Sequence, residues 1–113
     1  MGRELSLAAK DERAVQAFAR RLREALGPEV ISLKLFGSKA TGRAEPDSDL
    51  DILVEVREAR GDVWDRTLDV AFEVNLAHEV YISPRVVPQA VLDDPVWRAS
   101  PFLQLAESEG VPL

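Results

Sequence analysis

The pattern of hydrophobic and polar residues predicts a helix and then two strands in the first half of the chain. Over residues 5–26, apolar side chains recur at spacings of three and four, which places them on one face of an α-helix. The Gly-Pro pair at 27–28 then ends the helix. The segments 30–36 (VISLKLF) and 50–56 (LDILVEV) are predicted strands, and the turn-rich stretch between them has room for one or two helical turns over 38–43.

A second long helix is predicted after the second strand. It opens at Gly61 and Asp62, and we expect Asp62 to be its N-cap. The residues expected to mark its apolar stripe are Trp64, Leu68, Ala71 and Asn75, widened by Val70, Val74 and Ala77.

The remaining residues predict one strand and one interrupted helix. Residues 80–87 (VYISPRVV) are a strand that Pro84 interrupts or restricts to the edge of a sheet. Asp94 and Pro95 start a helix, and Pro101 within it favours two short helices or a kink. The residues expected to point inward are Trp97, Phe102, Leu105 and Ala106, and we interpret Trp64, Trp97 and Phe102 as core or interface residues.

This order of elements predicts an α/β (α+β) fold. Helices that alternate with three or four strands cover a small mixed sheet, because each amphipathic face must be buried against another layer. The chain has 113 residues, which is the usual size of one domain, so we expect a single domain over residues 1–113. It has no room for both a catalytic domain and a separate recognition domain.

Composition excludes several classes of function. The 46% of hydrophobic and 30% of charged residues are typical of a soluble globular protein. The absence of cysteine excludes disulfides and thiolate zinc sites, and the lone His78 cannot supply a multi-histidine metal site. A net charge of −6 argues against direct nucleic-acid binding. Without a membrane-spanning or signal-like apolar run, we expect a cytoplasmic protein without membrane contact.

The residues with the most informative chemistry lie where the first two strands face each other. The first strand ends in Gly37 and Ser38, and the second begins with Asp49, Leu50 and Asp51. Alternate residues of a strand point to the same side, so both carboxylates share one face while Leu50 turns to the core. Paired carboxylates suit a hard divalent cation such as Mg²⁺.

Gly37 and Ser38 add an anion-binding element to this pair. A glycine lets the backbone approach a phosphate closely, and Ser38 opens a short helix whose free N–H groups and hydroxyl attract anions. Each feature alone is common in structural turns. The combined pattern Gly-Ser-x10-Asp-x-Asp arises by chance in roughly one chain in a thousand of this length. Anion donors beside a cation site are what phosphoryl or nucleotidyl transfer needs.

The pattern Gly37-Ser38-x10-Asp49-x-Asp51 resembles the signature of the DNA polymerase β-like nucleotidyltransferase superfamily, and residues 30–56 resemble its minimal nucleotidyltransferase branch. The resemblance implies a polymerase-β-like nucleotidyltransferase fold. It also implies that Gly37 and Ser38 hold the phosphates of a nucleotide and that Asp49 and Asp51 are catalytic residues that bind the metal.

The family's third carboxylate is where this sequence departs from the pattern. The position that aligns with it is Ser83, which cannot be a carboxylate ligand. Glu79 has the same strand parity and is a candidate substitute, although it lies about 13 Å back along the strand. The site is therefore expected either to bind a second metal poorly or to depend on Glu79.

Further charged residues near the motif have two interpretations each. Lys39 and Arg43 either neutralise the triphosphate or lie on a solvated helix face. Arg85 reaches a phosphate or a neighbouring acid, or is simply exposed. His78 is interpreted as a surface residue at a helix C-terminus, where a positive charge is favourable. The cluster at 20–23, which holds three arginines, is interpreted as a solvated helix face.

The resemblance implies a specific function. It is Mg²⁺-dependent transfer of a nucleoside monophosphate, with AMP from ATP preferred, to a hydroxyl of a partner protein. Minimal nucleotidyltransferases are commonly the antitoxins of small helical HEPN-domain toxins, so we expect such a partner and a hetero-oligomer. Two alternatives stay open. One is a catalytically weak or inactive nucleotide-binding module that neutralises its partner by complex formation. The other, a stand-alone antibiotic-type nucleotidyltransferase, lacks the expected second domain.

Overall fold

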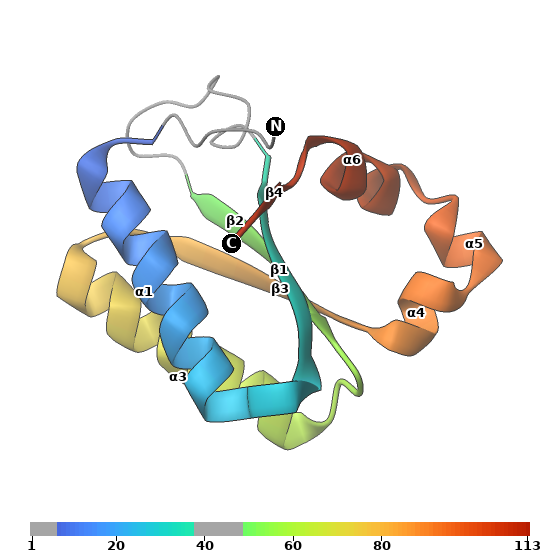
Figure 1. Cartoon of the computed structure of the whole chain (residues 1–113), viewed down its shortest axis with the longest axis horizontal. Coiled ribbons are helices and arrows are strands. Elements are labelled where there is room, and N and C mark those ends of the chain that lie inside the picture. The colour runs from blue at the N-terminus through green and yellow to red at the C-terminus, as the bar shows by residue number, and fades with distance from the viewer. Residues whose placement is uncertain (1–6, 38–48) are drawn as a thin grey trace.

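A computed structural model describes residues 7–37 and 49–113 of the chain (Figure 1). In these ranges the elements are α1 (Ala9–Leu26), the 3-10 turn η1 (Gly27–Glu29), β1 (Val30–Phe36), β2 (Leu50–Val56), α3 (Gly61–His78), β3 (Ile82–Pro88), α4 (Gln89–Asp93), α5 (Pro95–Arg98), α6 (Pro101–Glu109) and β4 (Val111–Pro112). None of the helices in these ranges is long and apolar enough to cross a membrane.

The strands form one mixed sheet in the order β3-β2-β1-β4. β2 pairs antiparallel with β1 and parallel with β3, and β4 pairs antiparallel with the outer edge of β1. The prediction of a small mixed sheet covered by helices is confirmed. The bounds of β1 and β2 agree with the predicted strands, and β3 lies at an edge of the sheet, as Pro84 indicated.

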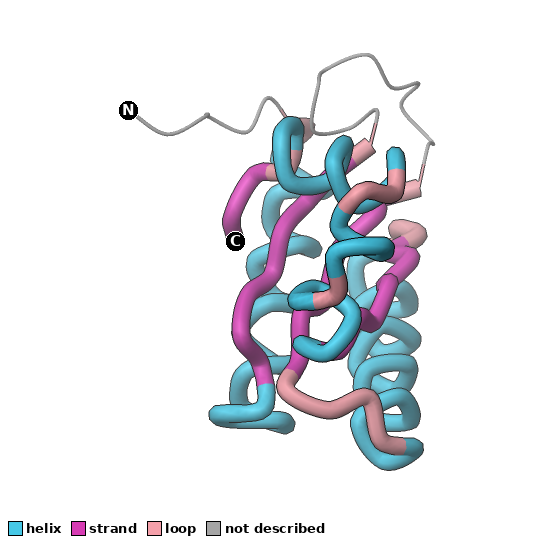
Figure 2. The backbone as a smooth tube through the Cα atoms, turned by 90° about the vertical axis from the view of Figure 1, so that its right-hand side faces the viewer, coloured by secondary structure: helices cyan, strands magenta, loops and turns pink. Residues whose placement is uncertain are grey.

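Helices lie on both sides of this sheet. α1 and α3 cover one face, and α4, α5 and α6 lie on the other, as the two perpendicular views in Figures 1 and 2 agree. The main hydrophobic core fills the space between the sheet and the first pair of helices. It includes, from α1, Val15, Phe18 and Leu22, and from β2, Leu50, Ile52, Val54 and Val56.

Strand alternation explains what remains for the opposite face. Since the even-numbered residues of β2 enter the main core, the odd-numbered ones point away from α1 and α3. Leu53 packs there with Phe36 and Ala106 in a second, smaller apolar cluster. The sheet is thus covered on this side by α6, which reaches the last residue of β1 through the contact of Phe102 with Phe36.

The predicted apolar face of α3 is confirmed in part: Val70, Ala71 and Val74 are buried as expected, whereas the first two turns of the helix bury other residues than predicted. Its buried residues are Val63, Thr67, Val70, Ala71 and Val74. Thr67 can enter the core because its hydroxyl donates a hydrogen bond to the Val63 carbonyl at 2.7 Å. Trp64 and Leu68 are instead 39% and 50% exposed.

The start of α3 also differs from the prediction. The N-cap residue is Arg60, without a side-chain capping bond, so the assignment of Asp62 as N-cap is wrong. Asp62 lies within the first turn and accepts a hydrogen bond from Arg60 Nε at 3.2 Å. An acidic residue is favourable there because it faces the positive end of the helix dipole.

The C-terminal helices are interrupted as Pro101 predicted. Asp94 caps α5 by accepting a bond from the Val96 N–H at 2.9 Å, and Ser100 caps α6 by accepting from the Leu103 N–H at 3.2 Å. The helix α4 and the strand β4 were not predicted.

The predicted burial of this helical segment is mostly wrong. Ala106 is buried as expected, together with Leu103, whereas Trp97 and Leu105 are about half exposed. Phe102, which is 40% exposed, packs edge-on against Phe36 with ring centroids 5.4 Å apart. Because helices of four to nine residues are too short for a well-defined periodicity, their inward face is set by the sheet they cover.

Candidate functional site

The predicted motif residues that the structure describes meet at one end of the sheet. β1 ends at Phe36, β2 begins at Leu50, and Phe36 pairs with Asp51 across the two strands. Gly37 follows directly, with a positive φ of 81°. A Cβ on Gly37 would lie 2.8 Å from Asp51 Oδ2, so a side chain at this position would collide with the carboxylate. The positive φ favours glycine here, and a side chain at this position would force the Asp51 carboxylate to shift.

The electrostatics of Asp51 reflect a half-buried carboxylate with a like charge beside it. Asp49 is exposed and Asp51 is partly buried, and strand alternation places them on the same face. Burial raises the pKa of Asp51, the charge of Asp49 raises this pKa further, and Arg85 lowers it. Two oxygen-donor groups that repel each other provide a donor set that a Mg²⁺ ion would fit, with its other positions left to water and phosphate.

The neighbouring strand brings Ser83 and Arg85 to this carboxylate pair. In the parallel register Asp51 lies beside Ser83, and Leu53 lies beside Arg85. The residue aligned from sequence with the family's third acid is therefore the strand neighbour of Asp51. Its hydroxyl carries no charge, so it cannot replace a carboxylate as a metal ligand. Arg85 is exposed, as one of its interpretations expected, and its charge lowers the pKa of Asp51.

Glu79 lies outside the strand that carries Ser83. It follows the last residue of α3, adopts a left-handed conformation with φ of 55° and is exposed. Its carbonyl accepts a hydrogen bond from Lys10 Nζ at 3.2 Å. Across residues 7–37 and 49–113, no three His, Cys, Asp or Glu side chains form a group that could hold a metal, so Glu79 does not complete a three-residue group with Asp49 and Asp51.

The other predicted nucleotide-binding residues, Ser38, Lys39 and Arg43, lie outside the described residues. Their roles stay predictions. Gly37 is the part of the predicted phosphate-binding turn that the structure describes, and its place against Asp51 joins that turn to the carboxylate pair.

A polar cluster further down the same face of the sheet was not predicted. Glu55 is only 6% exposed, and its Oε1 lies 3.1 Å from Lys34 Nζ. Ser32 also donates a hydrogen bond to this oxygen. The alternation of LDILVEV, which places Asp51 and Glu55 on one side, is the sequence signal that could have identified it.

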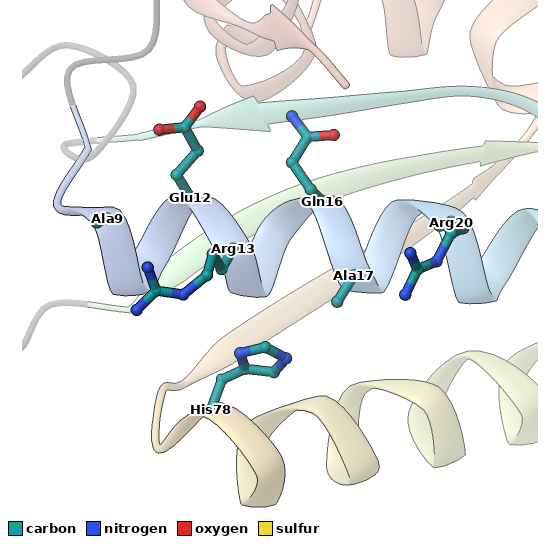
Figure 3. Close-up of a pocket in the computed structure, with 7 residues that line it drawn as sticks. All are labelled: Ala9, Glu12, Arg13, Gln16, Ala17, Arg20 and His78. Carbon is teal, nitrogen blue, oxygen red and sulfur yellow. The ribbon is translucent and has the colours of Figure 1, made fainter.

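His78 belongs to a different part of the molecule. It is the last residue of α3 and lines an open hollow of about 670 Å³ between α1 and α3. Figure 3 shows Arg13 and Arg20 extending from α1 toward α3, and His78 extending from α3 toward α1. This hollow lies on the side of the sheet that α1 and α3 cover, opposite the face that carries Asp51. The predicted place of His78 at a helix C-terminus is confirmed.

Two of the three predicted solvent-facing arginines are held by specific contacts. Arg21 forms an ion pair with Glu73 of α3, and Arg23 donates a hydrogen bond to the Leu113 carbonyl at 2.8 Å. Arg20 is exposed. The cluster therefore ties α1 to α3 and to the last residue of the chain as well as facing solvent.

Solved structures share this fold. A protein described as a minimal nucleotidyltransferase aligns with a TM-score of 0.59 at 21% identity, over 96% of this chain and 99% of that chain. A crystal structure of a toxin–antitoxin with AMP-PNP aligns with a TM-score of 0.59 at 18% identity, over 93% and 72%. A mutant of the toxin–antitoxin MntA–HpeT aligns with a TM-score of 0.52 at 17% identity, over 91% and 69%.

Sequence comparison is more specific about the family. No curated protein matches the chain. The nucleotidyltransferase domain family matches it over residues 15–101, a range that includes the whole motif from Gly37 to Asp51 and extends to β3 and α5. The family match spans most of the chain, and the fold is that of a minimal nucleotidyltransferase; the chain therefore belongs to the nucleotidyltransferase domain family.

Proposed function

We propose that this protein is a Mg²⁺-dependent nucleotidyltransferase that transfers AMP from ATP to a hydroxyl group of a partner protein, and that it acts as the antitoxin of a small helical HEPN-domain toxin. The observation that carries the proposal is the contact geometry at the end of the sheet. Gly37, at the start of the predicted phosphate-binding turn, lies directly against the carboxylate of Asp51. The phosphate-binding and cation-binding parts of the motif are thereby adjacent.

The residues at this end of the sheet have separate roles in the proposed reaction. Asp49 and Asp51 would hold the metal, which when bound offsets the charge of the nucleotide phosphates and supports departure of pyrophosphate. The Gly37 turn, continued by Ser38, orients the phosphates. The acceptor hydroxyl attacks the α-phosphorus, the bond to the β-phosphate oxygen breaks, and the hydroxyl proton passes to solvent or a nearby base.

What the solved structures with this fold contain supports the proposal. One is a toxin–antitoxin structure with AMP-PNP, and another is a toxin–antitoxin mutant. AMP-PNP is an ATP analogue, which supports ATP as the nucleotide, and the toxin–antitoxin context supports a protein partner.

A second candidate function is favoured by Ser83. Because this serine lies beside Asp51, where the family has its third acid, the chain would lack one metal ligand and one means of activating the acceptor. The protein would then bind nucleotide and restrain its partner by complex formation alone.

A transfer assay separates the two functions. Purified protein, the product of the adjacent gene, Mg²⁺ and α-labelled ATP are incubated, and label is followed on protein. We expect label on the partner that disappears with EDTA and in Asp49→Ala or Asp51→Ala, while both variants keep the wild-type unfolding temperature within a few degrees. An intact complex without label would reject the enzyme and support the restraining module. Residual transfer in either variant would reject the metal assignment.

A further inference from the structure

The outer side of α3 carries large apolar side chains that nothing in the described chain covers. Trp64, Leu68, Phe72 and Leu76, which we call the α3 stripe, are 39%, 50%, 64% and 67% exposed. Residues spaced by four on a helix form one slanted row, so these side chains are continuous on the surface. Isolated exposed apolar residues are normal, but a continuous row of this kind marks an interaction site.

The α3 stripe ends in a hollow near the end of the sheet that carries the carboxylates. This hollow, of about 500 Å³, is lined by Phe72, Asn75, Leu76, Glu79, Val80 and Tyr81. Tyr81 is 73% exposed, and its carbonyl accepts a hydrogen bond from the N–H of Leu50 at 2.7 Å. Leu50 lies between Asp49 and Asp51. A molecule bound over the hollow would therefore lie beside the residues that begin β2.

The start of the β3 edge, next to this hollow, is poorly suited to pairing with another strand. β3 is an edge strand, but Pro84 has no N–H to donate. The N–H of Ile82 donates to Asn75 Oδ1 at 2.7 Å, and Asn75 Nδ2 donates to the Ile82 carbonyl at 3.4 Å. Since these backbone groups are already bonded, side-chain contact with the α3 stripe is the mode of binding that remains, which suits a helix laid along a helix.

Charge beside the α3 stripe restricts what can bind. Asp65 and Asp69 are exposed, follow the same four-residue spacing and form no ion pair within the described ranges. The nearby Arg66 is turned to α1, where it donates to the Ala25 carbonyl at 2.9 Å. The apolar row is thus bordered by two exposed carboxylates that no described residue neutralises.

This border disfavours two other occupants. A second copy of the chain packed with its α3 antiparallel about a two-fold axis would place Asp65 and Asp69 on the same side as their own counterparts, and both copies have a net charge of −6. A membrane surface with anionic lipids would repel the same carboxylates. The complementary surface is an apolar helix bordered by Lys or Arg.

We propose that the α3 stripe and its hollow are the docking surface for the helical partner protein, which contributes an apolar helix ridge flanked by basic residues. This inference rests on the proposed function for the existence of the partner. It adds that the partner binds along α3 and approaches the carboxylates from the Tyr81 side.

The decisive experiment measures the affinity of the full chain for the product of the adjacent gene by titration calorimetry. Phe72→Glu and Leu76→Glu should each weaken the dissociation constant by at least about 30-fold, as loss of a central apolar contact does. Trp97→Glu is the matched control, since this exposed aromatic residue lies on α5, on the other side of the sheet. It should change the constant less than about threefold.

A second variant tests the charge argument without touching the apolar row. The double charge reversal Asp65→Lys with Asp69→Lys should weaken binding about tenfold at low salt and much less at high salt, because screening removes the contribution of exposed charges. Thermal unfolding and Mg²⁺–ATP binding of each free variant should match wild type, which separates docking from nucleotide chemistry.

Four outcomes overturn the inference. If Phe72→Glu and Leu76→Glu leave the dissociation constant of the complex unchanged, the α3 stripe is not the docking surface, and the proposed function is unaffected. If light scattering shows that the wild-type protein is a dimer and that Phe72→Glu is a monomer, the surface binds a second copy of the chain. If the wild-type protein binds vesicles of phosphatidylcholine and phosphatidylglycerol and Phe72→Glu abolishes this binding, the α3 stripe is a lipid-binding surface. No complex with the adjacent product rejects the partner in the proposed function, and this docking surface with it.

Discussion

Gly37 and Asp51 occupy one small space at the end of the sheet, so the size of one residue controls the position of the other. The distance of 2.8 Å from a Gly37 Cβ to Asp51 Oδ2 is shorter than real contacts allow. The sequence motif predicted that Gly37 would favour close approach of a phosphate. The contact with Asp51 could not be predicted, because it depends on how β1 and β2 are registered.

Substitution of Gly37 by alanine tests this contact against a matched glycine. Gly27 also has a positive φ, of 56°, but a Cβ there would have nothing within 4 Å. Gly27→Ala should cost about 1–3 kcal/mol from its backbone conformation alone, since φ of 56° with ψ of −130° is a region that side chains rarely adopt. Gly37→Ala should cost about 1–2 kcal/mol more, measured by urea unfolding. In an Asp51→Ala background the extra cost should disappear; if it persists, the carboxylate is not its cause.

Neutralising Asp51 should stabilise the protein at neutral pH in the absence of metal. Its raised pKa means that the folded state favours the protonated form, so its stabilising contribution is complete below the usual Asp pKa and is lost as pH rises through the raised pKa. Asp51→Asn should therefore increase the free energy of unfolding in urea at pH 7, with EDTA present, and have little effect near pH 3. A loss of stability at pH 7 would contradict the assigned repulsion.

At the scale of elements, the strands and the apolar face of α1 were predictable, whereas the face of α3 was predicted only in part. The sequences of β1 and β2 are rich in apolar residues, alternating in β1 and nearly continuous in β2, and turn-forming residues flank both strands. Their predicted bounds agree with the structure. In α3, Trp64 and Leu68 were predicted in the core in place of their neighbours Val63 and Thr67. Thr67 can be buried because its hydroxyl is satisfied within the helix, and Asn75 serves β3 instead of the core. Both side-chain bonds depend on the folded structure, and composition alone favours Trp64 and Leu68 as core residues.

The buried pair between β1 and β2 gives a prediction about sheet stability. Lys34 Nζ lies 3.1 Å from the buried Glu55 carboxylate. Lys34→Met should destabilise the protein by about 3 kcal/mol, because it leaves a buried charge without its partner. The double variant Lys34→Met with Glu55→Leu should recover most of this loss in urea unfolding at pH 7. Equal destabilisation by the single and double variants would show that the pair is not coupled.

At the scale of the whole molecule, the two layers of helices separate two functions. The end of the sheet carries the proposed nucleotide chemistry, while the outer side of α3 carries the proposed docking surface. The sequence motif predicted the first of these, because its residues are local in the chain and specific in type. It could not predict the second, since exposure of the α3 stripe depends on which side of the helix faces the sheet.

Restoring an acid on β3 should increase the transfer activity of the complex. Ser83 lies beside Asp51, so Ser83→Asp would provide a third carboxylate next to the pair. We expect at least a tenfold increase in the rate of AMP transfer, on the order of the gain from one acid–base or metal-binding group. Ser83→Asn is the isosteric control without charge. If Ser83→Asp and Ser83→Asn lower the rate of AMP transfer equally, the site does not need a third carboxylate at this position and uses the serine.

The pairing of β4 with β1 has a consequence for how the protein is made. Leu35 pairs with Val111, and the Leu113 N–H donates to the Leu33 carbonyl at 2.9 Å, so residues 111–113 cover the outer edge of β1. During synthesis β1 leaves the ribosome long before β4, and its outer edge stays open in the interval. Residues 111–113 must be synthesised before this edge is protected, which exposes the nascent protein to aggregation and proteolysis until then.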